Sequence, residues 1–445
     1  MEPGALVLVS AHVAVVLYGS RGDIQPGLAL ALELEARGHR VSVALPPNLA
    51  GLAIEVGLHT IEIGLDTHTA WSSPEAEAEA VRGSHGLARA RFALATVRRG
   101  FTAFDDSLAA EFVDPGARLS DVDLIVAAPL CQDRCLALSE HLGTSLVVLR
   151  FAPMSHNSVF GAIPGLTDSW SAEWKRRSWR VTDRLTWLAT GWNENRFRRR
   201  LGLPRARGPL PERMQQAGIV AIQAYDREIE PRLESEWGAT KPIVGFMDLP
   251  RRSRVGISET SGEGTDLAEW LDAGTPPVFV TVGSMSIAEP VATLDMIVRA
   301  VRGTGQRCLL SATDYDGVGR SDPDVFVVGA LDHAAVLPRC RAAIHHGGAG
   351  TTGATLRAGL PTMVCAVTAE QPFWAARVTA LGVGVGRRLA SLTGDDCATG
   401  VAVLTSRSTR ETARELASRM TDPREAVDAA AQICEAHLSR SLAPA

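Results

Sequence analysis

Short runs of consecutive apolar residues alternate along the chain with longer segments that favour helices. Residues 13–18 form such a run, the helix formers of 26–37 follow it, and 40–45 is the next run. Gly38 stands where a helix is expected to end in a left-handed residue. Strand, helix and strand in this order predict a βαβ unit, and therefore a parallel sheet with functional loops at the carboxyl ends of its strands.

The same alternation occurs in both halves of the 445-residue chain, which is longer than one hydrophobic core usually serves. Strands are expected at 124–128, 145–149, 277–282, 325–328 and 361–367. We predict an α/β protein of two Rossmann-like, doubly wound domains that face each other across a cleft. The expected limits are 1–240 for the first domain, 241–264 for a linker, 265–420 for the second domain, and 421–445 for a C-terminal helix that packs back on the first.

Composition and charge narrow the class of protein. Apolar residues make up 46% and charged residues 21% of the chain, which is ordinary for a soluble globular protein. The net charge of −5 argues against nucleic-acid binding. Seven scattered cysteines without a C-x-x-C pair favour a reducing cytoplasm and no structural zinc or disulfides. The apolar stretch 5–18 is too short to span a bilayer and lacks the basic start of a signal peptide.

A glycine-rich turn at 345–353 is the most informative motif. Small residues let the backbone approach a ligand closely, and the chain then enters a helix near Thr351, which Gly359 and Pro361 end. The free N–H groups and partial positive charge at a helix N-terminus favour a diphosphate, to which His346 and the hydroxyls of Thr351 and Thr352 could donate. The structural alternative is an ordinary tight turn.

Two further groups of residues carry candidate chemistry. Glu370 and Gln371 follow the strand at 361–367, and a carboxylate beside a carboxamide suits the vicinal hydroxyls of a sugar; alternatively, Glu370 is only a helix-start acid. Asp23 lies in the loop after the first strand and could accept a proton from a hydroxyl, or it could merely stabilise the helix at Pro26. Near a helix N-terminus its carboxylate should stay ionised.

Between residues 170 and 200 lie five of the nine tryptophans among many basic residues. This stretch has the composition of a helix, and two uses are open. The aromatic residues could line an apolar pocket or, with the basic ones, contact a membrane surface. The alternative is a pair of amphipathic helices with tryptophan toward the core and arginine toward water. Three D-x-D triplets, which begin at Asp121, Asp314 and Asp322, are expected in surface loops, and no metal site is predicted.

Taken together, these motifs resemble those of bacterial GT-B glycosyltransferases of family 1, the natural-product branch that includes glycopeptide, macrolide, rifamycin, sterol and mycobacterial glycopeptidolipid glycosyltransferases. The resemblance covers nearly the whole chain. It rests on the segments 19–26, 331–339 and 345–352, and on Glu370 to Trp374 with Arg377.

The resemblance implies a role for each matching residue. His346, Thr351 and the amides of Gly348, Ala349 and Gly350 would hold the diphosphate. Ser284 would contact it from the other side, the Leu331 backbone would meet the base, and Glu370 and Gln371 would hold sugar hydroxyls. Asp23 would be the base, at a position where many relatives carry a histidine, and Ser20 and Arg21 beside it are candidate donor contacts.

The implied reaction is transfer of a hexose from a UDP- or TDP-sugar to a hydroxyl of a large apolar acceptor, with inversion and without a metal or other cofactor. Glu370-Gln371 replaces the usual Asp-Gln pair, and Val328 and Ala354 replace the tryptophan and the ribose-binding glutamate of plant relatives, so the base and the sugar stay open. A monomer or homodimer is expected. The alternatives are a sugar-binding accessory protein and a nucleotide-dependent oxidoreductase, although the first turn lacks G-x-G-x-x-G.

Overall fold

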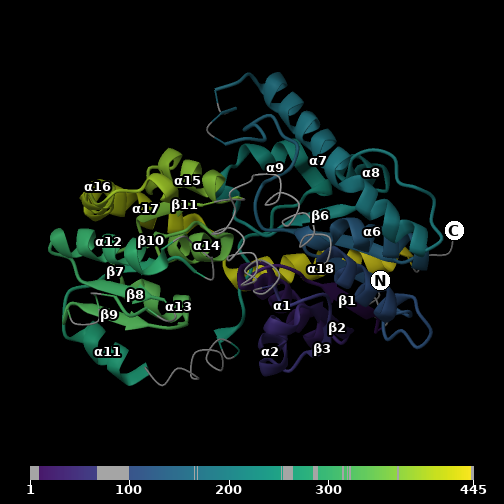
Figure 1. Ribbon diagram of the computed structural model, residues 1–445, viewed down its shortest axis with the longest axis horizontal. Helices are drawn as coiled ribbons and strands as arrows, with labels where there is room; N and C mark the ends of the chain where they lie inside the picture. The colour runs from purple at the N-terminus through teal and green to yellow at the C-terminus, as the bar shows by residue number, and fades with distance from the viewer. Residues whose placement is uncertain are drawn as a thin grey trace, which may run out of the picture.

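Two parallel β-sheets of six strands each form the framework of the protein, shown in Figure 1. The computed structural model describes residues 10–67, 100–164, 166–167, 169–251, 253, 264–283, 289–312, 315–317, 319, 322–367 and 370–441. Of the predicted linker at 241–264, residues 252 and 254–263 lie outside the described part of the chain. The interiors of the inner strands of both sheets are buried, as expected of strands covered by helices on both faces.

The first sheet has the strand order β3-β2-β1-β4-β5-β6. Its strands are β1 (His12–Val16), β2 (Arg40–Leu45), β3 (His59–Glu62), β4 (Leu124–Ala127), β5 (Ser145–Arg150) and β6 (Val220–Gln223). Its helices are α1 (Arg21–Ala36), α2 (Pro47–Glu55), α6 (Gln132–Leu142), α7 (Ala172–Arg200), α8 (Leu210–Gln216) and α9 (Arg232–Trp237).

The second sheet has the order β12-β11-β10-β7-β8-β9, which is the same doubly wound pattern counted from β7. Its strands are β7 (Val278–Thr281), β8 (Cys308–Ser311), β9 (Val325–Val328), β10 (Ala342–His345), β11 (Thr362–Ala366) and β12 (Gly384–Arg388). Its helices are α11 (Gly264–Asp272), α12 (Pro290–Gly303), α13 (His333–Val336), α14 (Ala349–Arg357), α15 (Gln371–Ala380), α16 (Gly394–Thr405) and α17 (Arg407–Arg419). The predicted pair of doubly wound units is therefore confirmed.

The last helix, α18 (Pro423–Ser441), packs against α1, β4 and β5 of the first sheet. Its buried residues Ala430 and Cys434 join the core that also holds Leu28 and Leu34 of α1. At the rim of this contact, the Arg37 guanidinium of α1 lies 2.8 Å from the Glu435 carboxylate. The chain thus crosses from the second sheet back to the first.

Two local predictions are wrong. Helix α1 begins at Arg21, one turn before the expected start at Pro26, because Ser20 caps it and Ile24 N–H donates to the Ser20 carbonyl. Pro26 therefore lies inside the helix, and Asp23 is in its first turn rather than in a loop. Helix α7 is one continuous helix, not a pair of helices.

The tryptophans of the 170–200 stretch also differ from the expectation that they face the core. Trp179 is buried, but Trp170, Trp174 and Trp192 are exposed. Several arginines near the end of α7, in contrast, are paired with carboxylates rather than free in water. Among the described residues, no helix is both long enough and apolar enough to cross a membrane.

Candidate functional site

Several predicted site residues follow the strands at which each sheet reverses its order, whereas Glu370 and Gln371 follow β11 and Leu331 follows β9. In the first sheet this point lies between β1 and β4, and the chain after β1 leads to Ser20 and Asp23. In the second it lies between β7 and β10, and the glycine-rich turn follows β10 directly. Ligands of open α/β sheets bind at such switch points. Helices α1 and α14, which begin there, pack against each other, so the two switch points adjoin.

The shape of the glycine-rich turn requires residues without a side chain at some positions. Gly347 has a φ of 92°, and a Cβ there would come within 2.5 Å of Val364 Cγ1. Its N–H donates to His345 Nδ1 at 3.0 Å, which fixes the turn. Gly348 is the N-cap of α14, and a Cβ on Gly350 in the first helical turn would meet no atom within 4 Å. The first turn of α14 is therefore uncovered beside Gly350, which leaves room for an anion there.

The His346 ring packs closely against two glycines. A Cβ on Gly283, just after β7, would lie 2.5 Å from His346 Cε1, and one on Gly348 would lie 2.6 Å from its Nε2. Burial lowers the pKa of His346 to about 4, and the nearby His333 adds to this effect. The ring is therefore neutral near pH 7. Its Nδ1 is buried without a hydrogen-bond partner among the described residues.

The two threonines of the turn differ. Thr352 is fully buried, and its hydroxyl donates to the Gly348 carbonyl at 2.9 Å within the helix. It stabilises the first turn of α14 and is not directed at a ligand, contrary to the expectation for Thr352. Thr351 is half-buried beside Gly350, at the helix start.

Asp23 closes a capping box at the start of α1. Its Oδ2 accepts hydrogen bonds from the Ser20 N–H and the Ser20 hydroxyl, each at 2.8 Å. Gly19 has a φ of 137° and lies directly under this carboxylate. Burial raises the pKa of Asp23, and the hydrogen bonds from Ser20 oppose the rise. The expected effect of the helix start is thus outweighed by desolvation, and the carboxylate is a stronger base than an exposed one.

Glu370, which follows β11 of the second sheet, lies within electrostatic reach of Asp23. It is the N-cap residue of α15, half-buried, and burial raises its pKa. The charge of Asp23 raises the pKa of Glu370 further, so the two carboxylates lie close enough to repel each other. The structure thus brings together two acids that are separated by almost 350 positions in the sequence.

Gln371 is buried, and its carboxamide oxygen accepts the Val367 N–H at 2.8 Å. That half of the carboxamide holds the end of β11 in place. Next to it, Trp374 is fully buried among aromatic residues of both halves of the chain. Arg377 of α15 donates to the Ile229 carbonyl at 2.7 Å, which ties α15 to the first half.

A polar cluster that the sequence did not reveal links the two helices that begin at the site. Asp248 accepts from Gln25 of α1 at 2.8 Å and from Arg357 of α14 at 3.3 Å. Arg21 and His333 lie within electrostatic reach of Asp248, and burial lowers the pKa of His333 to about 4. Asp248 is thus the counter-charge between α1 and α14.

Replacing Asp248 with alanine is expected to lower the free energy of unfolding by about 1–3 kcal/mol, because it leaves partly buried donors without an acceptor. Urea titration measures this loss. The matched control is Asp272→Ala, which removes a largely exposed carboxylate from an ion pair with Arg339 and should cost under about 1 kcal/mol. Equal losses in the two variants would contradict the linking role of Asp248.

The remaining predicted residues have the following positions. Arg21 is half-buried in the first turn of α1, and burial lowers its pKa. Leu331 lies between β9 and α13, where its side chain packs on the core beneath α13. Ser284 is outside the described residues.

Two residues near the carboxyl edge of the first sheet were also missed. Arg150 ends β5 and donates to Gln132 at 2.6 Å, while its Nε is buried without a partner among the described residues. Asp183 of α7 is within electrostatic reach of Arg150, and burial raises its pKa to about 6. Only the position of Arg150 at the end of a predicted strand could have indicated it.

Two of the three D-x-D triplets contribute carboxylates to ion pairs. Asp121 pairs with Arg40, and Arg302 lies 2.8 Å from Asp322. Asp314 is outside the described residues, among which no cluster of three or more metal-binding side chains occurs.

A hollow of about 500 Å³ lies elsewhere, between segment 242–244 and α18, and no predicted site residue lines it.

Two family models match the chain. Residues 13–104 match the glycosyltransferase family 28 N-terminal domain, and residues 308–436 match the C-terminal domain of erythromycin biosynthesis protein CIII-like proteins. An uncharacterized glycosyltransferase of Mycobacterium tuberculosis is 37% identical over 95% of this chain and 97% of its own length. A sterol 3-beta-glucosyltransferase of Arabidopsis thaliana is 27% identical over 84% of this chain and 59% of its own length.

Solved structures share the fold. The glycotransferase of kitacinnamycin superposes with a TM-score of 0.66 over 97% of this chain and 100% of its own, at 18% identity. Arabidopsis thaliana UGT89C1, complexed with UDP-L-rhamnose, gives a TM-score of 0.63 over 96% of this chain and 100% of its own, at 17% identity.

Proposed function

The chain belongs to the GT-B glycosyltransferases of family 1, and from this we propose that it transfers a hexose from a UDP- or TDP-sugar to a hydroxyl of a large apolar acceptor, with inversion and without a metal ion. Membership of this family excludes the alternative that the protein is a nucleotide-dependent oxidoreductase. The observation that carries the proposal is the packing of α1 against α14, which brings the helix start that holds Asp23 close to the glycine-rich turn, with Glu370 within electrostatic reach of Asp23.

In this proposal the donor diphosphate lies against α14. The amides of Gly348, Ala349 and Gly350 meet its charge, as the partial positive end of a helix favours. His346, neutral because burial lowers its pKa to about 4, donates one N–H. Thr351 adds a hydroxyl, while Ser284 and the Leu331 backbone remain proposed contacts of the diphosphate and the base.

The sugar lies between Glu370 and Asp23. The Glu370 carboxylate accepts hydrogen bonds from sugar hydroxyls, and Gln371 contributes through its amide group, because its oxygen already accepts from Val367. Ser20 and Arg21 are proposed to contact the donor from the first half. A sugar hydroxyl shared between the two acids would relieve their repulsion.

Transfer then needs one base and no covalent intermediate. The acceptor oxygen attacks the anomeric carbon in line and its proton passes to Asp23, while the bond to the nucleotide diphosphate breaks on the opposite face and the configuration inverts. The burial that raises the pKa of Asp23 makes it a better proton acceptor. The α14 amides and His346 stabilise the charge that develops on the leaving diphosphate, which is the task a metal ion performs in other enzymes.

An apolar acceptor is supported by exposed apolar residues at the edge of the sheet from which Asp23 follows. Leu65, after β3, and Leu130, in the short 3-10 helix after β4, are exposed at the carboxyl edge of the first sheet. One relative is named a sterol 3-beta-glucosyltransferase, and a sterol is an acceptor of this chemistry. Macrolide, ansamycin, other polyketide and glycolipid acceptors belong to the same class.

Nucleotide protection tests the donor site. We expect UDP or TDP to raise the melting temperature, by the equivalent of about 2.7 kcal/mol at a hundredfold excess over Kd, and NAD to have no effect. Gly350→Ala should leave the free protein folded and weaken this protection, because its methyl would occupy the open space before α14. Protection by NAD alone, or none by either nucleotide, would contradict the proposal.

Mass spectrometry of apolar aglycones incubated with UDP- and TDP-glucose, with and without EDTA, tests the rest. We expect a hexose adduct at the same rate in EDTA, and an inverted anomeric configuration in the NMR spectrum of the isolated product. An EDTA-sensitive rate would overturn metal independence alone, and retention would overturn the role of Asp23 as a simple base.

A further inference from the structure

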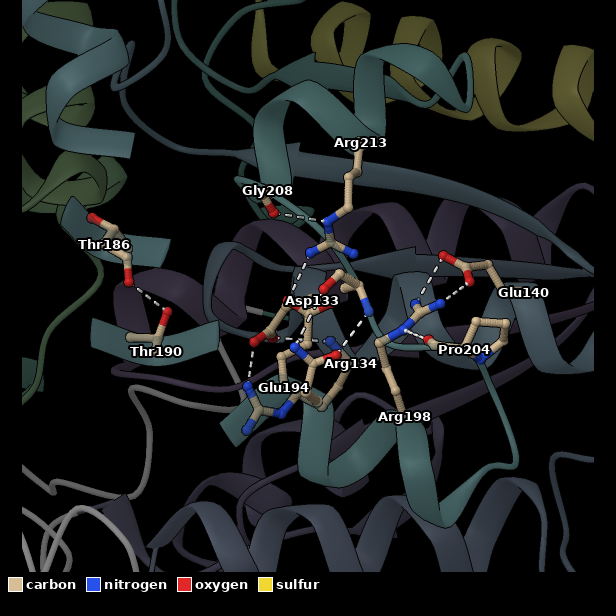
Figure 2. A network of polar contacts seen from close by, with 12 residues as sticks. Asp133, Arg134, Glu140, Thr186, Thr190, Glu194, Arg198, Pro204, Gly208 and Arg213 are labelled. Atoms are coloured by element: carbon tan, nitrogen blue, oxygen red, sulfur yellow. Dashed lines mark hydrogen bonds and ion pairs between the residues drawn. The ribbon is translucent and has the colours of Figure 1, made fainter. Parts of the chain in front are cut away.

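Helix α7 has two unlike ends. Its C-terminal half is anchored in the first domain by charged side chains, which Figure 2 shows. Arg213 of α8 donates to Glu194 at 2.6 Å, and Arg198 donates to Glu140 of α6 at 3.0 Å. Its N-terminal half projects beyond the body of the molecule at the top of Figure 1. Within the described part of the chain, contacts hold one side of this half: Trp179 is buried, and its indole N–H donates to the Phe160 carbonyl at 2.9 Å.

The exposed side of α7 carries a stripe of large apolar residues. Counting 3.6 residues per turn, its members fall within a sector about 60° wide. They are Trp174, Val181, Leu185, Leu188 and Trp192, with exposed fractions between 47% and 76%. Ile163, Leu166 and Trp170 in the preceding loop are also exposed, and Trp170 meets Trp174 edge to face. We call these eight residues the α7 patch.

Exposed apolar side chains are concentrated in the α7 patch rather than scattered over the surface. It holds eight of the thirteen large apolar side chains that are exposed in the described part of the chain. Single exposed apolar residues need no explanation, whereas a contiguous group marks a surface that binds something.

Arginines border the α7 patch. Arg177 and Arg184, seven residues apart, lie on one flank of the stripe, and Arg180 follows them around the helix. Arg177 stacks on Trp174 at 4.8 Å and pairs with Glu173. Within the described part of the chain, Arg180 and Arg184 form no ion pair. Since the chain as a whole carries a net charge of −5, this positive surface is local.

We propose that the α7 patch docks the protein on an anionic lipid surface, with its apolar side chains in the interfacial layer and Arg180 and Arg184 on headgroup phosphates. Tryptophan at both ends of an apolar stripe with arginine beside it is the composition of helices that lie in a membrane interface. A projecting convex helix also fits a broad soft surface better than a protein groove.

Docking on lipid would assist the proposed sugar transfer. The docking proposal itself does not depend on the proposed function. The loop under α7 reaches the donor side of the site, because the Phe160 ring lies 4.9 Å from that of Phe373, two residues beyond Gln371. An apolar acceptor partitions into the bilayer, so a protein held there by α7 meets the acceptor at high local concentration.

Sedimentation of the full chain with vesicles, without any donor, tests the docking. We expect binding to vesicles of phosphatidylcholine with about a third phosphatidylglycerol, and at least about tenfold weaker binding to phosphatidylcholine alone. Leu185→Gln with Leu188→Gln, and separately Arg180→Gln with Arg184→Gln, should each weaken binding about tenfold or more. The matched control, Ile54→Gln with Val403→Gln, alters exposed apolar residues of α2 and α16 and should bind like the wild type.

Tryptophan emission gives a second readout. We expect vesicles to shift the emission to the blue, and Trp174→Phe with Trp192→Phe to reduce the shift while preserving sedimentation. Binding that the leucine and arginine changes leave intact would overturn the proposal. So would absence of binding in protein that UDP still protects, a result that leaves the proposed function standing. Self-association in light scattering that Leu185→Gln with Leu188→Gln abolishes would assign the patch to a second copy of the chain instead.

Discussion

Replacing Asp23 with asparagine is expected to lower kcat/KM for sugar transfer by about a hundredfold or more, which is the range for losing a general base. The amide cannot take the acceptor proton, yet its oxygen can still accept the two hydrogen bonds from Ser20 that close the capping box. The helix start should therefore survive, and the melting temperature should change little. Initial rates with a saturating donor measure the effect.

Ser20→Ala is the matched control, because it removes a capping hydroxyl and leaves the carboxylate. The Ser20 hydroxyl bond lowers the pKa of Asp23, so its loss should raise that pKa. Asp23 must be ionised to act, so the acid limb of kcat/KM should move to higher pH in Ser20→Ala and disappear from the residual rate of Asp23→Asn. An Asp23→Asn enzyme with more than about a tenth of the wild-type rate would show that Asp23 only caps α1.

Local patterns in the sequence were sufficient to predict the architecture and the positions of the main motifs. Buried strands appear as apolar runs, and the turns after them appear as glycine or acid, so the turn at His346 and the pair at Glu370 could be located. Five strands were missed. The edge strands β3 and β12 are short and partly polar, and β6, β8 and β10 are mostly apolar runs of only four residues. The early start of α1 was missed because Pro26 suggested the first turn, and the capping bond of Ser20 outweighs it.

Features that depend on the meeting of distant segments could not be predicted. Asp248 is an isolated carboxylate in the sequence, and its contacts with Gln25 and Arg357 exist only because α1 and α14 adjoin. The pKa of Asp23 also required the fold: the sequence indicated a helix start that favours the ion, whereas burial at the boundary between the halves outweighs it. Which tryptophans of α7 face outward depends likewise on what covers the helix.

Replacing His346 with alanine is expected to lower kcat by about a hundredfold to a thousandfold, the range for losing one donor that stabilises developing charge. Gly283 and Gly348 hold the imidazole on both sides, so the ring is positioned before the donor arrives. An ordered donor acts most strongly when charge builds on the leaving diphosphate, so kcat should fall more than donor affinity does. Single-turnover rates and UDP protection, measured on the same variant, separate these two effects.

Two further variants test whether the loss of rate comes from the imidazole at the glycine-rich turn. Gly283→Ala keeps the imidazole but forces it to move, because the new Cβ would lie 2.5 Å from His346 Cε1, so it should also slow transfer. His59→Ala, on the edge strand β3, removes an imidazole far from the turn and should leave the rate unchanged. Since burial lowers the pKa of His346 to about 4, its neutral form acts, and the pH profile between about 5 and 8 should keep its shape in His346→Ala. If the wild-type rate instead fell as pH rose through about 6.5 and His346→Ala abolished that fall, the protonated ring would be the active form.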